Sequence, residues 1–154
     1  MRAVAFDVGQ RRIGVAISDA TLTLARPVGI LRASSLESDG LRLATSEIDR
    51  LTAEDDGVSV IVIGLPRRLD GSPTDMTERI RAFAENLART TRLPIVFQDE
   101  RLTSHEAESR LALTDRSWRS RKERLDAVAA AIVLQDYLDT RPGRPVPVAV
   151  DPEL

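Results

Sequence analysis

Three acidic positions, far apart along the chain, give the strongest indication of chemistry. Asp7 lies in the apolar run VAFDVG, where a buried carboxylate needs a cation, a hydrogen-bond donor or a proton to offset its lost hydration. An Asp that caps the following GQRR turn is an equally good interpretation, because D-x-G is a common turn pattern. Asp7 taken alone does not separate the two interpretations.

The second acidic position is the pair Asp99 and Glu100, which closes the apolar run IVFQDE. Side chains alternate between the two faces of a strand, so only one of the two acids can belong to a given site. We expect the other acid to be solvated at the strand end, with Arg101 as its ion partner.

The third acidic position is Asp126, at the start of the last predicted helix. The residues three, four and seven positions later are small or apolar: Ala129, Ala130 and Val133. An acid in the first turn of a helix is favoured by the macrodipole, typically by about 0.3–1 kcal/mol. The macrodipole would explain an exposed acid, but Asp126 is aligned with the apolar face of the helix. We therefore expect Asp126 to be functional.

The composition restricts what chemistry these acids can do. The chain has no cysteine, which excludes disulfides, thiolate nucleophiles and Cys-containing zinc sites, and its single His105 excludes His-rich metal sites. Carboxylates suit hard ions, so the expected cofactor is Mg²⁺ or Mn²⁺. Three clustered carboxylates repel one another, and a pair of ions about 3.5–4 Å apart would relieve the repulsion and promote an in-line phosphoryl displacement.

Basic residues are concentrated where a phosphodiester substrate would need them. Between residues 116 and 124, five positive charges occur in nine residues of a chain whose net charge is −2. Such charge runs are usually solvated surface, but this local excess favours phosphate binding. Trp118 within the run either stacks on a base or covers the core. The candidate nucleic-acid-binding residues are Arg11, Arg12, Arg67, Arg68, Arg101, Arg116, Trp118, Arg119, Arg121, Lys122 and Arg124.

The elements that must position these residues follow from the hydrophobic pattern. Short apolar runs bounded by turn residues predict strands at 2–8, 13–19, 26–32, 58–63 and 93–98. Capping boxes at Ser34/Glu37 and Thr103/Glu106 predict two helix starts, the first with Leu36, Leu43, Ile48 and Leu51 on its apolar side. Further helices are predicted at about 75–90 and 122–139, and a short strand at 146–150.

This order of elements predicts an α/β fold of the ribonuclease H-like type. An antiparallel meander followed by βα units implies a mixed five-stranded sheet with helices packed on its faces. Right-handed crossovers leave strand order 3-2-1-4-5 as the simplest arrangement, which makes the strand of Asp7 central. The 154 residues form one predicted domain, with a core at about 1–139 and a Pro-rich tail at 140–154. No apolar run reaches a membrane span and no signal pattern opens the chain, so we expect a cytoplasmic protein.

Four blocks resemble the successive motifs of the YqgF/RuvX family over about residues 3–138: FDVGQRRIGVAISD, IGLPRRLDGSPTDMTERIRAFAENL, DERLTSHEAE and KERLDAVAAAIVLQDYL. These bacterial proteins have a RuvC-like, ribonuclease H-type fold. The resemblance implies that Asp7, Glu100 and Asp126 are the catalytic metal ligands, with Asp99 as a rival to Glu100. The family commonly has Thr-Lys where this chain has Gln10–Arg11, and Trp118 is bulky for its segment, so the departures concern substrate preference rather than the carboxylates.

The function implied by the resemblance is a divalent-metal-dependent nuclease. Its expected substrate is the 5′ end of pre-16S rRNA, in ribosome biogenesis and near ribosomal particles; resolution of four-way DNA (Holliday) junctions is the alternative. A monomer or weak homodimer is expected, because no long apolar dimer face is evident. Two other classes are less favoured. Actin-like ATPases need two such domains, and a catalytically silent RNA-binding module would not need all three acids.

Overall fold

The protein is described here by a computed structural model that covers residues 1–66, 68, 70–99 and 118–141, the side chains of 118–126 excepted. Its five strands are β1 (Arg2–Val8), β2 (Arg12–Ser18), β3 (Ala25–Arg32), β4 (Val58–Leu65) and β5 (Ile95–Asp99). Its helical elements are a π-helical turn, η1 (Leu36–Gly40), and the helices α1 (Leu41–Thr52), α2 (Asp75–Thr90) and α4 (Trp118–Thr140).

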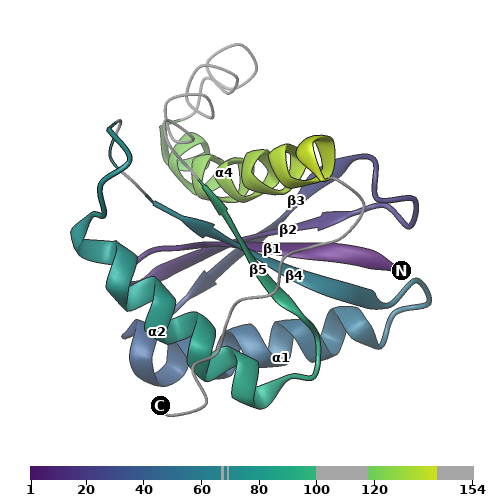
Figure 1. Ribbon diagram of the computed structural model, residues 1–154, viewed down its shortest axis with the longest axis horizontal. Helices are drawn as coiled ribbons and strands as arrows, with labels where there is room; N and C mark the ends of the chain where they lie inside the picture. The colour runs from purple at the N-terminus through teal and green to yellow at the C-terminus, as the bar shows by residue number, and fades with distance from the viewer. Residues whose placement is uncertain (67, 69, 100–117, 142–154) are drawn as a thin grey trace.

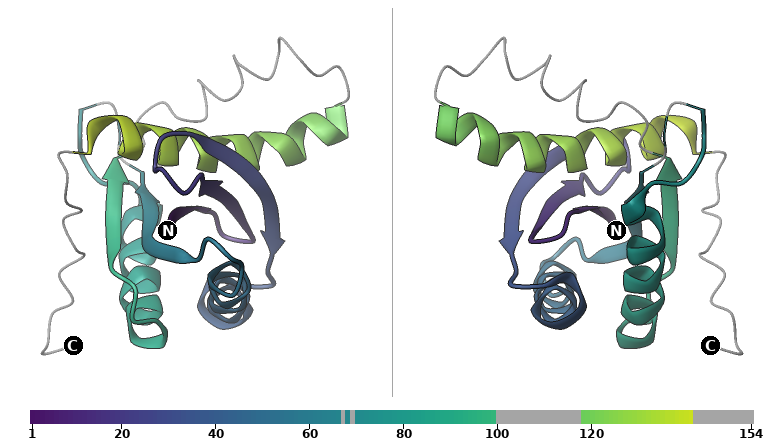
Figure 2. Two further views of the ribbon diagram at one scale, coloured as in Figure 1. Left: turned by 90° about the vertical axis from the view of Figure 1, so that its right-hand side faces the viewer. Right: turned by 90° about the vertical axis from the view of Figure 1, so that its left-hand side faces the viewer.

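The strands form one mixed sheet in the order β3-β2-β1-β4-β5, which confirms the predicted fold class and topology. β1 pairs with β2, and β2 with β3, in antiparallel fashion, whereas β1–β4 and β4–β5 are parallel. Helix α4 lies on one face of the sheet, and α1 and α2 lie on the other (Figures 1 and 2). Strand β1 is therefore central and covered by helices on both sides.

The two faces of the sheet bury side chains of very different size. On the side of α1 and α2, β1 contributes Val4, Phe6 and Val8 to the larger core. On the side of α4 it contributes only Ala3 and Ala5, which pack in a second cluster with α4. Small side chains let a helix approach the sheet closely, so α4 lies near the strand backbones.

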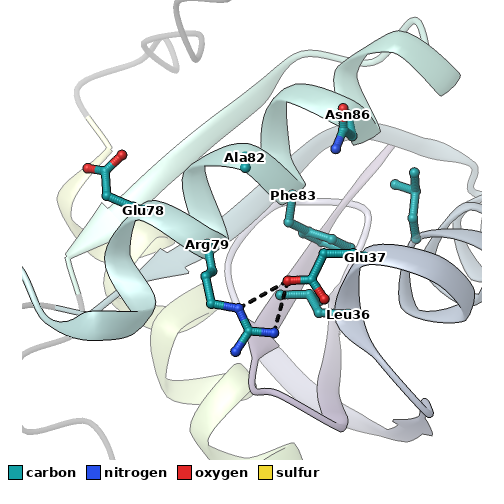
Figure 3. A pocket seen from close by; sticks show the side chains of 8 residues that line it. Leu36, Glu37, Glu78, Arg79, Ala82, Phe83 and Asn86 are labelled. Carbon is teal, nitrogen blue, oxygen red and sulfur yellow. Dashed lines mark hydrogen bonds and ion pairs between the residues drawn. The ribbon is translucent and has the colours of Figure 1, made fainter.

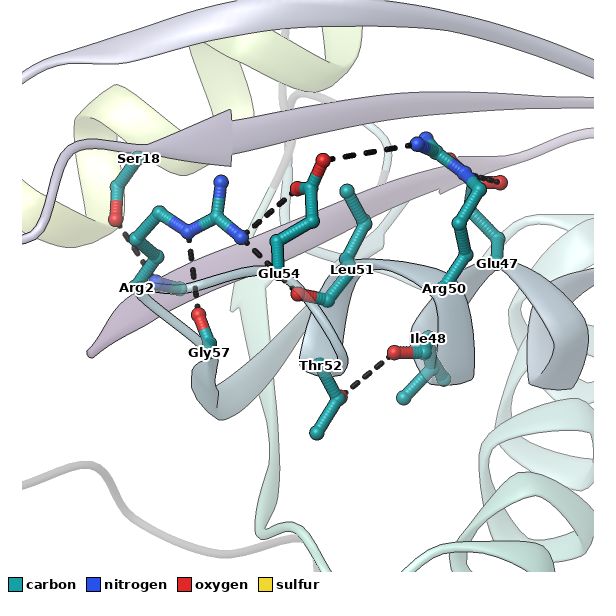
Figure 4. A network of polar contacts seen from close by, with 10 residues as sticks. Arg2, Ser18, Glu47, Ile48, Arg50, Leu51, Thr52, Glu54 and Gly57 are labelled. Carbon is teal, nitrogen blue, oxygen red and sulfur yellow. Dashed lines mark hydrogen bonds and ion pairs between the residues drawn. The ribbon is translucent and has the colours of Figure 1, made fainter.

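The N-terminal end of β1 is held by a buried arginine (Figure 4). The Arg2 side chain donates to the carbonyl oxygens of Gly57 (3.1 Å) and Leu51 (3.0 Å) and to a Glu54 carboxylate oxygen (3.0 Å). Arg2 is only 6% exposed, so these bonds replace its hydration. The network ties the end of α1 to the start of the central strand.

The structure corrects two sequence-based predictions. Ser35, not Ser34, caps the first helical segment and accepts from the Ser38 backbone N–H (3.3 Å). Glu37 does not complete a capping box, because Arg79 of α2 binds its carboxylate at 2.9 Å. The S-x-x-E pattern failed here because two serines are adjacent and because a distant arginine competes for the glutamate.

The second correction concerns the last helix, predicted to begin at about residue 122. Helix α4 begins at Trp118, so residues 118–121 are helical rather than part of a basic loop. The segment contains no Gly or Pro, and Arg and Lys are good helix formers, which explains the earlier start. The predicted short helix at 103–113 and strand at 146–150 lie outside the described residues. Within the described residues, no helix is both long and apolar enough to cross a lipid bilayer.

Candidate active site

Asp7 lies near the C-terminal end of the central strand and is half-buried. Side chains alternate along β1, so Asp7 shares the face of Ala3 and Ala5, the face that α4 covers. On the β2 side its register partner is Gly14, which is buried and carries no side chain. Asp7 thus lies on the face between the sheet and α4, and it has a polar or electrostatic interaction in the structure.

The turn after Asp7 is tight and requires glycine. The Gly9 backbone N–H donates to the Arg12 carbonyl oxygen at 2.8 Å, and a Cβ at position 9 would lie 3.0 Å from that same oxygen. The Arg11 carbonyl oxygen accepts from the Ala33 N–H at 2.9 Å, which joins the turn to the end of β3. Arg12 precedes Gly14 by two residues in β2, so its side chain lies on the same face of the sheet as Asp7. Arg11 lies in the turn and is exposed.

Strand β5 places one of the two acids that the sequence left as rivals. Asp99 pairs with Leu65 and follows Ile95 and Phe97 at two-residue intervals. Those apolar residues belong to the core under α1 and α2, so Asp99 lies on the face opposite to Asp7. Glu100 lies outside the described residues, as do Arg67, Arg101 and Arg116.

Asp126 lies in the described backbone of α4, four residues before Ala130, while its side chain lies outside the described part. Ala130 and Val133 pack in the cluster between α4 and the sheet, so position 126 belongs to the helical stripe that faces the sheet. Trp118, Arg119, Arg121, Lys122 and Arg124 also lie in the α4 backbone, with side chains outside the described part. Within the described side chains, no three acids or histidines gather into a metal-binding group.

The loop between β4 and α2 is ordered by its own polar groups. Asp70 accepts from the Ser72 hydroxyl (2.6 Å) and backbone N–H (2.9 Å), and these bonds lower the pKa of Asp70 below its usual range. Arg68 is exposed, and its backbone N–H donates to the Ser72 carbonyl oxygen at 2.9 Å. Thr77 in the first turn of α2 donates to the Pro66 carbonyl oxygen at 2.9 Å. The loop therefore presents Arg68 to solvent beyond the C-terminal end of β4.

Sequence reasoning missed two residues beside Asp7. Gly64 follows Ile63, the partner of β1 residue Phe6, so it stands next to Asp7 in β4. Gln98 is the β5 partner of Gly64 and precedes the rival acids. Because side chains alternate along a strand, Gln98 lies on the same face of β5 as Val96. The sequence could not show that this is also the face of Asp7.

A cavity of about 240 Å³ lies on the other face, between η1 and α2 (Figure 3). Its walls include Leu36 and Phe83, and the Glu37–Arg79 ion pair crosses its rim. None of the predicted site residues lines this cavity. Asp7 and this cavity therefore lie on opposite faces of the sheet.

Comparison with known proteins agrees with this architecture. The family model described as "RuvX: Holliday junction resolvase" matches residues 1–140. A "Putative pre-16S rRNA nuclease" of Anaeromyxobacter sp. (strain Fw109-5) is 42% identical over 141 residues, 92% of this chain and 98% of the relative. A protein of the same name from Dechloromonas aromatica (strain RCB) is 44% identical over 137 residues, 89% of this chain and 90% of the relative.

A solved structure supports the fold alone. The chain of T. thermophilus RuvC in complex with Holliday junction substrate matches with a TM-score of 0.54 and 12% sequence identity. The match covers 95% of this chain and 99% of that chain. This chain therefore shares its overall fold with that structure, which confirms the ribonuclease H-like prediction.

Proposed function

This chain belongs to the RuvX family, and we propose that it is a nuclease that uses divalent metal ions to hydrolyse phosphodiester bonds in structured RNA. The proposed substrate is the 5′ end of the 16S rRNA precursor, which the enzyme would meet near ribosomal particles. Relatives that are 42–44% identical over about nine-tenths of the chain are named for this activity, which supports the proposal.

The structural observation that carries the proposal is the place of Asp7. Asp7 places a half-buried carboxylate at the end of the central strand, between the backbone positions of Gly14 and Gly64, which carry no side chain. Glycine inside a strand often marks a place where a ligand approaches closely. The carboxylate oxygens of Asp7 are hard donors that fit Mg²⁺ or Mn²⁺. Glu100, two residues after Gln98 in the sequence, and Asp126, whose position belongs to the sheet-facing stripe of α4, would join Asp7 as metal ligands.

The residues of this chain would divide the work of hydrolysis among them. Bound Mg²⁺ or Mn²⁺, in a pair, would activate water and stabilise the leaving 3′ oxygen. Asp7 places its carboxylate on the α4 face, where it would hold a cation, and Arg12 on the same face would supply positive charge toward the phosphate. Arg11 and Arg68, both exposed at this end of the sheet, would neutralise neighbouring phosphates.

Holliday junction resolution is the second candidate, because the matching family model carries that description. Symmetric resolution needs two sites related by a two-fold axis and thus a dimer. Light scattering at working concentration tests this requirement: a strict monomer that cleaves RNA favours rRNA processing, and a stable dimer favours the junction.

The deciding experiment compares cleavage of a pre-16S rRNA 5′ fragment and a four-way DNA junction, each with Mg²⁺ or Mn²⁺. We expect Asp7→Asn to abolish cleavage while leaving the fold intact, or slightly more stable in metal-free buffer, because it removes charge repulsion and a strong ligand together. Asp99→Asn is the matched control, since it changes an acid on the opposite face. Wild-type turnover by Asp7→Asn would refute the site.

A further inference from the structure

On the α4 face, the three parallel strands present side chains in rows. Ala5 of β1 pairs with Val62 of β4, and Val62 pairs with Val96 of β5. All three are buried in the cluster under α4, so this row faces that helix. The next row on the same face lies two residues further along each strand, toward the C-terminal ends.

That next row consists of Asp7, Gly64 and Gln98. Gly64 pairs directly with Gln98, and Gly64 follows Ile63, the partner of β1 residue Phe6. The middle position has no side chain, so no side chain of β4 stands between the carboxylate of Asp7 and the amide of Gln98. With strands about 4.8 Å apart, the outer two Cα atoms are roughly 10 Å apart. We call the β4 position between them, which lacks a side chain, the notch. A glycine inside a strand often marks a place where a ligand or another chain approaches closely.

The side-chain amide of Gln98 has hydrogen-bonding capacity that the described part of the chain does not use. The side chain of Gln98 is half-buried, yet it makes no hydrogen bond with any side chain or backbone group in the described part of the chain. Gln135 of α4 behaves differently: its amide binds the Thr23 carbonyl oxygen and the Ala25 N–H, both at 2.9 Å, and so serves the fold. The two N–H groups of Gln98 remain able to donate to an acceptor above the sheet.

We propose that Gln98 is a substrate-binding residue whose amide donates to a phosphate oxygen of the nucleic-acid strand, and that Gly64 is the floor on which this strand lies. The inference rests on the proposed function, in which Asp7 belongs to the reacting end of the notch. A neutral amide orients a phosphate without adding charge beside the carboxylates. The contact is to the backbone, so it is independent of base sequence.

The test is nucleic-acid binding by fluorescence anisotropy, with the pre-16S rRNA fragment and the four-way junction, in Ca²⁺ and in metal-free buffer. Gln98→Leu keeps the approximate size of the side chain and removes its hydrogen bonds. We expect it to weaken binding about tenfold to a hundredfold, the range for a hydrogen bond to a charged group. The dependence of affinity on salt should not change, since no charged contact is lost. The melting temperature should stay within about 2 °C of wild type.

The Gly64→Ala variant tests whether the nucleic-acid strand needs the space above Gly64. We expect it to weaken binding per folded molecule, because its Cβ enters the space between Asp7 and Gln98. Gly29→Ala in β3 is the matched control for glycine loss in a strand, as its Cβ meets no atom within 4 Å. Unchanged binding in Gly64→Ala would overturn the assignment of the floor.

The inference and the proposed function can fail separately. If Gln98→Leu binds both nucleic acids within twofold of wild type and melts normally, the inference is overturned, even when the wild-type enzyme cleaves RNA. If the wild-type protein cleaves neither substrate but Gln98→Leu still weakens binding, the notch stands as a nucleic-acid site and the proposed hydrolysis fails.

Discussion

Arg2→Met should destabilise the protein without changing its chemistry. The Arg2 side chain is 8% exposed and donates to two carbonyl oxygens and to Glu54. Met keeps an apolar stem of similar length and removes all the donors. Arg2 stands five residues before Asp7, roughly 16 Å along the strand, so the reacting end should keep its geometry.

The size of the loss in stability depends on which hydrogen bonds the partners of Arg2 retain in the variant. The Glu54 carboxylate is 46% exposed, so its ion pair with Arg2 is screened and contributes about 0–1 kcal/mol. The Leu51 carbonyl oxygen still accepts from the Glu54 N–H (3.2 Å), and the Gly57 carbonyl oxygen from the Arg2 N–H (3.3 Å). Neither carbonyl is orphaned, so each lost bond counts near the lower end of about 1.5–3 kcal/mol for charged donors. The expected loss is about 3–4 kcal/mol in the free energy of unfolding, or about 6–16 °C in melting temperature.

Guanidinium denaturation followed by far-UV circular dichroism measures this loss. Arg50→Met is the matched control: Arg50 also contacts Glu54, at 3.9 Å, but its side chain is 54% exposed. The control should lose less than about 1 kcal/mol. Equal losses in the two variants, or an Arg2→Met protein that melts within about 1 °C of wild type, would show that the buried network does not stabilise the strand.

Three further outcomes are expected. Glu100→Gln should cost far more cleavage activity than Asp99→Asn, because Asp99 lies on the face opposite to Asp7; a reversed ranking would mean that the β5 register is wrong by one residue. Backbone N–H groups of two serines lower the pKa of Asp39 to about 2, so its contribution to stability is present above pH 3.8 and is lost as pH falls through about 2; a carboxyl titration by NMR with a midpoint near 4 would contradict this. Alanine at three basic positions of α4 should lower the log–log salt slope of binding by about one unit per phosphate contact, and an unchanged slope would identify them as solvated surface. These positions are Arg119, Arg121 and Lys122.

The fold was predictable because the decisive signals are local. Continuous apolar runs such as residues 58–63 identify strands buried on both faces, and the order of elements leaves few chiral arrangements. The errors arose where a distant group decides the outcome. Glu37 fits a capping box in sequence, but Arg79, 42 residues away, takes its carboxylate. The start of α4 was missed because a basic, polar segment has the composition of a loop while its residues have good helix propensity.

The candidate site was predictable only in part, because a sequence shows residue types but not the face of the sheet on which each side chain lies. Asp7 and the rivalry between Asp99 and Glu100 followed from the pattern, yet only the sheet register assigns Asp99 to the core side of α1 and α2. Gly64 and Gln98 carry no signal by themselves. They become informative once the register sets them beside Asp7 on one face.

If Asp7 acts as proposed, the central strand keeps the residues that stabilise it apart from the residue that reacts, both across its width and along its length. On one face of the strand, Phe6 and its neighbours fill the core under α1 and α2. On the other face, the side chains of Ala3 and Ala5 are small, so α4 can pack close to the sheet. Along its length, Arg2 fastens the N-terminal end to α1, and Asp7 occupies the C-terminal end. The opposite face and the opposite end supply the burial and the hydrogen bonds that hold the strand in place, so Asp7 is not needed for that purpose. Substitutions at Arg2 and at Asp7 should therefore affect different properties, although one strand carries both residues.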